Sequence, residues 1–263
     1  MAKIHKPVVA GTFYPEDPSL LKQMLRQFLS SAPAHEKPPM AIIAPHAGYI
    51  YSGSIASSVY VRLHSVKHKI KKVLLIGPSH RVGFQGLALS TADQFLTPLG
   101  AIAIDTLAVK KIAEYPFAQF LDQAYEQEHC LEVHLPFLQT VLDSFSLIPV
   151  IVGNASAEQI CELIALFWDE PDTFTVISSD LSHFLDYGEA QIKDKKTSEL
   201  IEQLDYTKLD NNSACGRIPI SGLLALAKKY NLQVKTVDLR NSGDTAGSKG
   251  KNKVVGYGAY VIE

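Results

Sequence analysis

Three histidines each follow an apolar, strand-like run, at the point where the run ends in a turn. The runs "AIIAPH", "LLIGPSH" and "VISSDLSH" end at His46, His80 and His183. In open α/β sheets the loops after the carboxyl ends of the strands converge on one crevice, where ligands bind. If the three strands are parallel neighbours, we expect the three imidazoles to meet there. Imidazole binds metal ions and moves protons near neutral pH, so the pattern predicts a site for that chemistry.

Two acidic residues in predicted loops could take part in the same site. Asp180 lies three residues before His183, and Asp244 lies in the polar, glycine-rich stretch 241–252 after a predicted strand. Two imidazoles and one carboxylate with open positions suit non-haem Fe(II) and oxygen chemistry, and a third histidine can then act as acid or base. Zinc accepts nearly the same ligands and would activate water for hydrolysis. The residue types therefore predict a metal centre without separating these metals.

A second cluster, "EQEHCLEVHLPFL", places His129 and His134 five residues apart. On a helix, positions i and i+5 lie about 140° apart, so the two rings would not share a face. We expect His129 at a helix entrance, pointing elsewhere than His134. The cluster does not predict a metal site by itself, and a role for His129 in supporting the main crevice stays open.

Cys215 and Arg217 precede Pro219 in a pattern typical of a first helical turn. Backbone N–H groups at such an end favour thiolates and anions, so this pair is a candidate anion site. The alternative is a small buried cysteine beside a surface arginine. With Cys130 and Cys161, the chain has three widely spaced cysteines, an odd number that does not suggest a disulfide framework. Reduced thiols fit a cytoplasmic protein.

The elements that must position these residues follow from the apolar pattern. Continuous apolar runs alternate with helical patterns, which is typical of a sheet covered on both faces and gives an α/β fold class. The predicted strands are 40–44, 72–77, 147–153 and 173–179, and the predicted helices begin at Asp17 and lie near 54–64, 131–142, 156–168 and 188–204. Shorter runs at 87–90, 100–105, 233–240 and 254–263 predict further strands, some antiparallel at an edge, in a mixed, mostly parallel sheet.

Length and charge bound the classes of protein that remain. The 263 residues allow one or two domains, but the proline-rich connector 31–39 is too short to divide the chain, so we expect a single domain over 1–263. A formal net charge of -2, from 25 basic and 27 acidic residues spread along the chain, argues against nucleic acid or an anionic membrane as partner. No apolar run reaches the roughly 18 residues of a membrane helix, and no signal peptide is evident.

Six motifs, in order, carry a resemblance to a known family. They are "APHAGYIYSG", "GPSH", "EHCLEVHLPF", "SSDLSHF", "CGRIPI" and "NSGD". They resemble the Memo family, whose bacterial and archaeal members are also called AmmeMemoRadiSam system protein B. The match runs nearly end to end, from "PVVAGTFYP" to "VVGYGAY". The resemblance implies the LigB-like fold of the class III extradiol dioxygenases, which hold Fe(II) with two histidines and a glutamate.

Carried over by motif, the resemblance implies roles for individual residues. His46 and His80 match the two imidazole ligands, His183 matches the acid/base histidine, and His129 matches a further active-site histidine. The third ligand departs from the pattern, because neither a glutamate nor a cysteine stands in the C-terminal polar loop. Asp244 is the expected substitute.

The leading functional hypothesis is an iron-dependent, dioxygenase-like oxidoreductase acting on an unidentified small molecule. His46 and His80 would bind Fe²⁺, and His183, oriented by Asp180, would move protons, with Cys215 as the second choice for the third ligand. One alternative is a protein without turnover that holds iron or copper, or that binds an anionic peptide or metabolite through the helix start at residue 217. Another is a zinc-dependent hydrolase.

Overall fold

The computed structural model describes residues 2–32, 37–245 and 251–263. Residues 33–36 of the proline-rich connector and 246–250 of the polar loop lie outside the described residues. The main sheet has the strand order β10-β12-β2-β9-β3-β8-β4-β7, with β11 paired to the other side of β12. Its strands are β2 (Ala41–Ala44), β3 (Lys72–Pro78), β4 (Leu87–Leu89), β7 (Ala118–Phe120), β8 (Ser146–Val152), β9 (Thr173–Ser178), β10 (His183–Leu185), β11 (Val234–Asn241) and β12 (Val254–Ile262).

The centre of this sheet is parallel and its flanks are mixed. Strands β2, β9, β3 and β8 pair in parallel, whereas β12 pairs antiparallel with β2 and β4 pairs antiparallel with β8. The four central strands are buried along almost their whole length because helices cover both faces. The predicted neighbourhood is therefore confirmed: β2, β9 and β3 lie side by side, and their carboxyl ends share one edge.

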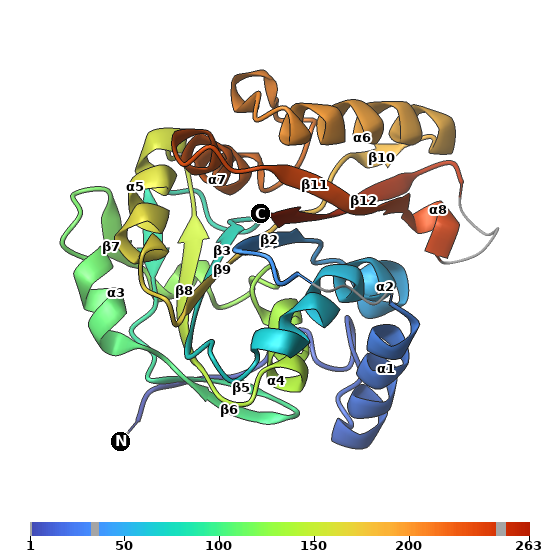
Figure 1. Ribbon diagram of the computed structural model, residues 1–263. Coiled ribbons are helices and arrows are strands. Elements are labelled where there is room, and N and C mark those ends of the chain that lie inside the picture. The colour runs from blue at the N-terminus through green and yellow to red at the C-terminus, as the bar shows by residue number, and fades with distance from the viewer. Residues whose placement is uncertain (1, 33–36, 246–250) are drawn as a thin grey trace.

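Helices form a layer on each face of the sheet. Figure 1 shows α5, α6 and α7 on one side and α1, α2 and α4 on the other, in agreement with the contacts between elements. The α/β class with helices on both faces is confirmed. The helices are α1 (Pro18–Ser31), α2 (Tyr49–Tyr60), α3 (Thr106–Ile112), α4 (Leu135–Val141), α5 (Ala157–Trp168), α6 (Tyr187–Glu202), α7 (Arg217–Lys229) and α8 (Ser242–Thr245), with 3₁₀ turns η1 (Val61–Val66), η2 (Asp122–Ala124), η3 (Glu132–His134) and η4 (Tyr206–Lys208).

Local sequence sets the helix starts. Asp17 caps α1 by accepting hydrogen bonds from the N–H groups of Ser19 and Leu20, and Ser156 forms a capping box with Gln159 at the start of α5. Each cap satisfies backbone donors that a helix leaves free at its first turn. These starts match the sequence predictions to within a residue or two.

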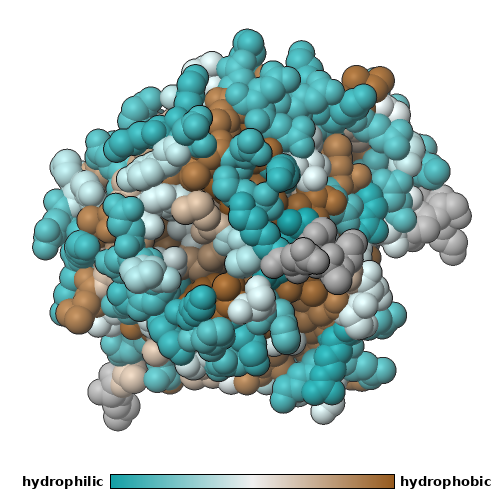
Figure 2. Space-filling view, in the orientation of Figure 1, coloured by the Kyte–Doolittle hydropathy of each residue, from teal (hydrophilic) through white to brown (hydrophobic). Residues whose placement is uncertain are grey.

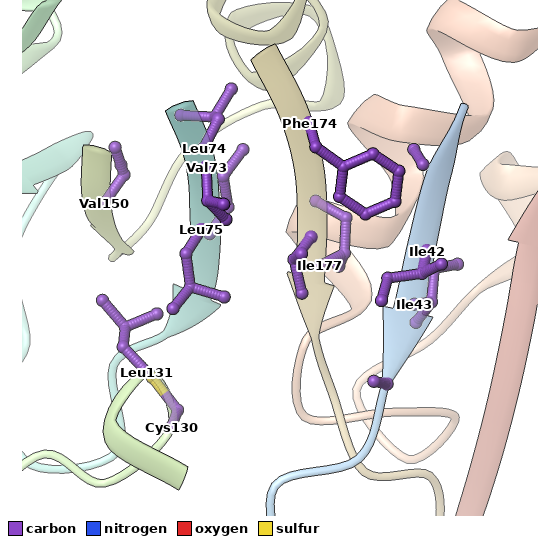
Figure 3. Close-up of a cluster of buried hydrophobic side chains, with 14 of the residues drawn as sticks. Ile42, Ile43, Val73, Leu74, Leu75, Cys130, Leu131, Val150, Phe174 and Ile177 are labelled. Carbon is purple, nitrogen blue, oxygen red and sulfur yellow. The ribbon is translucent and has the colours of Figure 1, made fainter. Parts of the chain in front are cut away.

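The described residues bury one continuous hydrophobic core, which makes the fold a single domain. Figure 3 shows side chains of β2, β9, β3 and β8, with Cys130 and Leu131 against the end of β3. On the face drawn in Figure 2, hydrophilic residues cover most of the surface and apolar residues show between them. In the described part of the chain, no helix has both the length and the apolar character needed to cross a membrane.

Three elements differ from the sequence prediction. The helix expected near 54–64 is α2, which begins at Tyr49 and ends at Tyr60. The strand expected at 100–105 is β6 (Gly100–Ala103), which lies outside the main sheet and forms a separate three-stranded sheet with β1 (Ile4–His5) and β5 (Gln94–Thr97). The helix expected from residue 131 begins as the 3₁₀ turn η3 and becomes α-helical only at Leu135. Pro136 in the first turn favours this start, because proline is tolerated there and not further inside a helix.

Candidate functional site

Two of the strand-end histidines lie close together at the carboxyl edge of the central sheet. His46 follows β2 and His80 follows β3, and the centroids of their rings are 5.1 Å apart. With Cys215 they form a group in which one ligand atom from each residue lies within 4.8 Å of the others. Two imidazoles and a thiolate at this spacing can be drawn onto a single cation.

Cys215 lies in the turn before α7, and this turn packs against the end of β9. Its N–H donates to the carbonyl oxygen of Asp180 (3.2 Å), and its Sγ lies 3.4 Å from Nε2 of His46. A Cβ at residue 216 would lie 2.6 Å from the carbonyl oxygen of Ser178, so glycine is required for this close approach. The turn thus places the thiol of Cys215 next to His46.

Glu128 is a buried carboxylate that holds His80. It accepts hydrogen bonds from Nδ1 of His80 (2.9 Å) and from the N–H groups of His80 (2.6 Å), His129 (2.9 Å) and Cys130 (3.0 Å). Burial alone would raise the pKa of Glu128, but the hydrogen bonds and charge of His80 bring it down to about 2. In the neutral form of His80, Nδ1 donates to the carboxylate and Nε2 carries the lone pair that a metal needs.

His129 lies beside the two histidines. Its ring stacks on that of His80 with centroids 4.9 Å apart, and it lies 5.4 Å from the ring of His46 and 4.8 Å from that of Phe13. The helical spacing argument does not apply, because residue 129 stands in a turn before η3. The two rings do have different surroundings, since His134 is buried in the core and His129 lines a cavity.

Asp180 lies behind His46 on the loop after β9. One oxygen accepts a hydrogen bond from the N–H of His46 (2.8 Å), and the other lies 4.0 Å from Nε2 of the same residue. Burial raises the pKa of Asp180 to about 7, so this carboxyl can give or take a proton near neutral pH. The structure therefore brings Asp180 to the histidine cluster.

His183 stands in β10, at an irregularity in its pairing with β12. The next residue, Phe184, has φ 60°, a left-handed conformation that bulky side chains rarely adopt. Partial burial lowers the pKa of His183, so its ring is neutral at neutral pH and can accept a proton. His183 does not belong to the group of potential ligands and instead lines the adjoining cavity.

That cavity has a volume of about 880 Å³ and opens beside the cluster. Phe13, Tyr51 and Tyr257 supply aromatic surface, and Ile50 and Val255 supply aliphatic surface. His129, Asp180 and His183 also line it, together with Lys253. A small, partly apolar molecule with polar groups fits such walls.

Asp244 and Arg217 do not belong to the ligand group. One oxygen of Asp244 accepts from the hydroxyl of Tyr187 and the other from the N–H of Asn241 (2.9 Å), so this carboxylate caps the short helix α8. Cys215, the second choice from the sequence, stands where Asp244 was expected. Arg217 donates to Asn211 and, together with Cys215, lines a second cavity of about 600 Å³.

The charge state of the cluster follows from its burial. Burial, followed by the charges of the neighbouring imidazoles, lowers the pKa of His46, so its ring is neutral. Burial and the charge of Asp180 raise the pKa of Cys215 to about 12, so the group carries a thiol when no cation is bound. Because thiolate is the form that coordinates metals, binding of a cation must release the thiol proton.

Comparison with known proteins identifies the family of this chain. The profile of the Memo-like protein family matches residues 5–261. The chain belongs to the Memo-like family. A MEMO1 family protein of Aquifex aeolicus is 34% identical, with 97% of each chain covered. Protein MEMO1 of Xenopus tropicalis is also 34% identical, over 83% of this chain and 82% of the relative.

A solved structure shares the fold of this Memo-like chain. It is an uncharacterised protein of Escherichia coli K12, with a TM-score of 0.55 and 9% sequence identity, and the match covers 84% of this chain and 98% of the other. At this identity the likeness concerns the fold alone. The resemblance inferred from the six motifs is confirmed by the family match.

Three residues of the site were missed as candidates from the sequence. They are Glu128, Ser178 and Phe13. The acidic run before His129 was a signal for Glu128, because histidine ligands usually donate to a carboxylate or carbonyl. Ser178 and Phe13 carry no such signal, since a serine at a strand end and an aromatic near the N-terminus are ordinary residues.

Proposed function

We propose that this Memo-like protein binds a metal ion with His46, His80 and Cys215 and acts as an oxidoreductase on a small molecule held in the adjoining cavity. The observation that carries the proposal is the approach of Cys215 Sγ to within 3.4 Å of His46 Nε2, in a group that includes His80. Two imidazoles and a thiol with free lone pairs are the donor types of transition-metal sites.

Iron is the metal implied by the similarity to the extradiol dioxygenases, and two imidazoles with a thiolate can hold it. When bound, iron would supply the electron-transfer chemistry that oxygen-dependent reactions need. The protein's own residues would bind and orient the substrate: Phe13, Tyr51 and Tyr257 would enclose its apolar body. His183 would take up a proton from the substrate, and Asp180, buried with a pKa of about 7, would hold or return one.

The thiol favours a second candidate function. A soft thiolate in place of a carboxylate suits Cu(I) and zinc as well as iron, so the same residues would serve a protein that holds a metal without turnover. Metal analysis of protein purified without oxygen, followed by oxygen uptake of the iron-loaded protein with catechols and aminophenols, separates the two. Oxygen uptake with any of these compounds supports the oxidoreductase, and tight metal binding without uptake supports the second candidate.

The proposed division of roles predicts different effects at two histidines. Replacing His80 by alanine should lower the affinity for Fe²⁺ or Zn²⁺ at least about tenfold, because it removes a ligand and leaves Glu128 without its partner. Replacing His183 by alanine should leave the affinity within about twofold, because this ring lines the cavity and does not join the ligand group. Competition with a chromophoric chelator measures both affinities. Equal losses in the two variants would contradict the division.

A further inference from the structure

A chain of four buried side chains runs from the core to His46. The hydroxyl of Tyr60 lies 2.7 Å from Nδ1 of His134, and Nε2 of His134 lies 2.8 Å from Oγ of Ser178. The same Oγ lies 2.6 Å from Nδ1 of His46. All four side chains are at most 1% exposed, so water does not compete for these hydrogen bonds.

The direction of these bonds is fixed at Ser178. Its hydroxyl has one hydrogen, and it lies 2.6 Å from the carbonyl oxygen of the buried Cys130. Among the described residues, no other hydrogen bond to that carbonyl is present, and a buried carbonyl without a donor is costly. The Ser178 hydrogen therefore goes to Cys130, and the two lone pairs of its oxygen accept from the two histidines.

The tautomers of both rings follow. His134 donates from Nε2 and accepts from the Tyr60 hydroxyl at Nδ1, which uses both of its nitrogens. His46 donates from Nδ1, so its Nε2 is left with a lone pair. That nitrogen faces Sγ of Cys215 at 3.4 Å. This series of hydrogen bonds thus selects the tautomer of His46 that can bind a metal through Nε2.

We propose that His134 is a positioning residue that, through Ser178, fixes the orientation and the tautomer of His46. Without the N–H of His134, the Ser178 side chain loses one of the three partners that hold its rotamer, so its oxygen holds the Nδ1 proton of His46 less firmly. The His46 proton would then move to Nε2 and block the lone pair. This inference rests on the proposed metal-binding function, and it adds to that function a residue without direct access to the ligand group.

The first test is the tautomer of His46 in metal-free protein. Nitrogen-15 labelling of histidine and long-range nitrogen–proton correlation distinguish the protonated from the bare ring nitrogen. We expect His46 to be protonated at Nδ1 and His134 at Nε2. Protonation of His46 at Nε2 in the wild type would overturn the inference, whatever the variants do. A merely structural role of His134 in the core does not require either assignment.

The second test uses variants and Zn²⁺ as a redox-inert probe. His134→Leu should shift part of the His46 population to the Nε2–H tautomer and lower Zn²⁺ affinity about tenfold. His134→Gln should restore most of the affinity, because its amide can donate to Ser178 and accept from Tyr60. Tyr260→Phe is the matched control. It removes another buried tyrosine hydrogen bond, to Ser198 (2.7 Å), which is not part of the hydrogen-bonded series that ends at His46.

The outcomes separate this inference from the proposed function. Unchanged tautomer and affinity in folded His134→Leu would overturn the inference and leave metal binding standing. An equal loss in Tyr260→Phe would also overturn it, because the effect would then be general destabilisation. The predicted tautomers in a protein that binds neither Zn²⁺ nor Fe²⁺ would instead overturn the proposed function.

Discussion

Replacing Cys215 by alanine is expected to lower the affinity for Zn²⁺ and Fe²⁺ by more than about 100-fold. Loss of an outer-shell partner already costs about 10–100-fold, and here a first ligand is removed. Of the donors in the ligand group, Cys215 alone carries no charge before binding and a full charge afterwards. Because its pKa is raised to about 12, Zn²⁺ binding near pH 7.5 should release about one proton in the wild type and none in the variant.

Calorimetry in two buffers of different ionisation enthalpy measures both the affinity and the proton release. Cys161→Ala is the matched control, because Cys161 is a free cysteine on α5 outside the ligand group. Asp244→Asn tests the ligand expected from the sequence, and we expect no change in affinity. A large loss in Asp244→Asn with little loss in Cys215→Ala would reverse the assignment of the third ligand.

The convergence of His46 and His80 could be predicted from the sequence for a physical reason. Both stand at the ends of continuous apolar runs, and such runs form parallel strands whose carboxyl ends share an edge. This prediction needs only the order of neighbouring strands in the sheet and not the path of any loop. It therefore works for residues that directly follow a strand.

The approach of Cys215 to the two histidines could not be predicted in this way. Cys215 lies 169 positions from His46 in the chain and meets it only because α7 packs against β9 through Gly216. Asp244 also follows a strand, β11, but its carboxylate accepts hydrogen bonds from Tyr187 and Asn241 and does not join the ligand group. A glycine beside a cysteine was the available signal, and its meaning depends on a contact that the sequence does not display.

The local structure around His129 differs from the helix expected from its spacing, although the resemblance had implied a place for this residue in the site. The spacing of His129 and His134 was interpreted on an α-helix, but the segment is a turn followed by η3, and α4 starts only at Leu135. The turn forms around Glu128, which accepts the N–H groups of the next two residues. Local hydrogen bonding to a side chain thus replaced the helical bonds that the period implies.

Replacing Glu128 by glutamine is expected to weaken both metal binding and the fold. Glutamine keeps a carbonyl oxygen for three of the donors but places an amide N–H₂ where Oε2 accepts the backbone N–H of His80, so two donors face each other there and His80 is displaced. We expect Zn²⁺ affinity to fall about 10–100-fold. The pKa of about 2, against an ordinary value near 4.5, corresponds to a loss of about 3 kcal/mol in the unfolding free energy of the metal-free protein.

The pH dependence of that loss has a definite sign. Because the pKa of Glu128 is lower in the folded state, its contribution is fully present above about pH 4.5 and disappears as the pH falls towards 2. The stability difference between wild type and Glu128→Gln should therefore shrink over that interval. Urea unfolding at several pH values measures it. A difference that grows as the pH falls would contradict the assignment of an ionised carboxylate.

Glu132→Gln is the matched control for this experiment. Both glutamates are 4% exposed, and both accept backbone N–H groups, those of Val8 and Val9 in the case of Glu132. Burial raises the pKa of Glu132, so the ionised form of this carboxyl does not stabilise the folded state as that of Glu128 does. The carboxylate of Glu132 also does not hold a histidine of the ligand group. We expect Glu132→Gln to loosen the N-terminal segment and to leave Zn²⁺ affinity unchanged. If both variants lose affinity equally, Glu128 acts through the general stability of the fold and not through the orientation of His80.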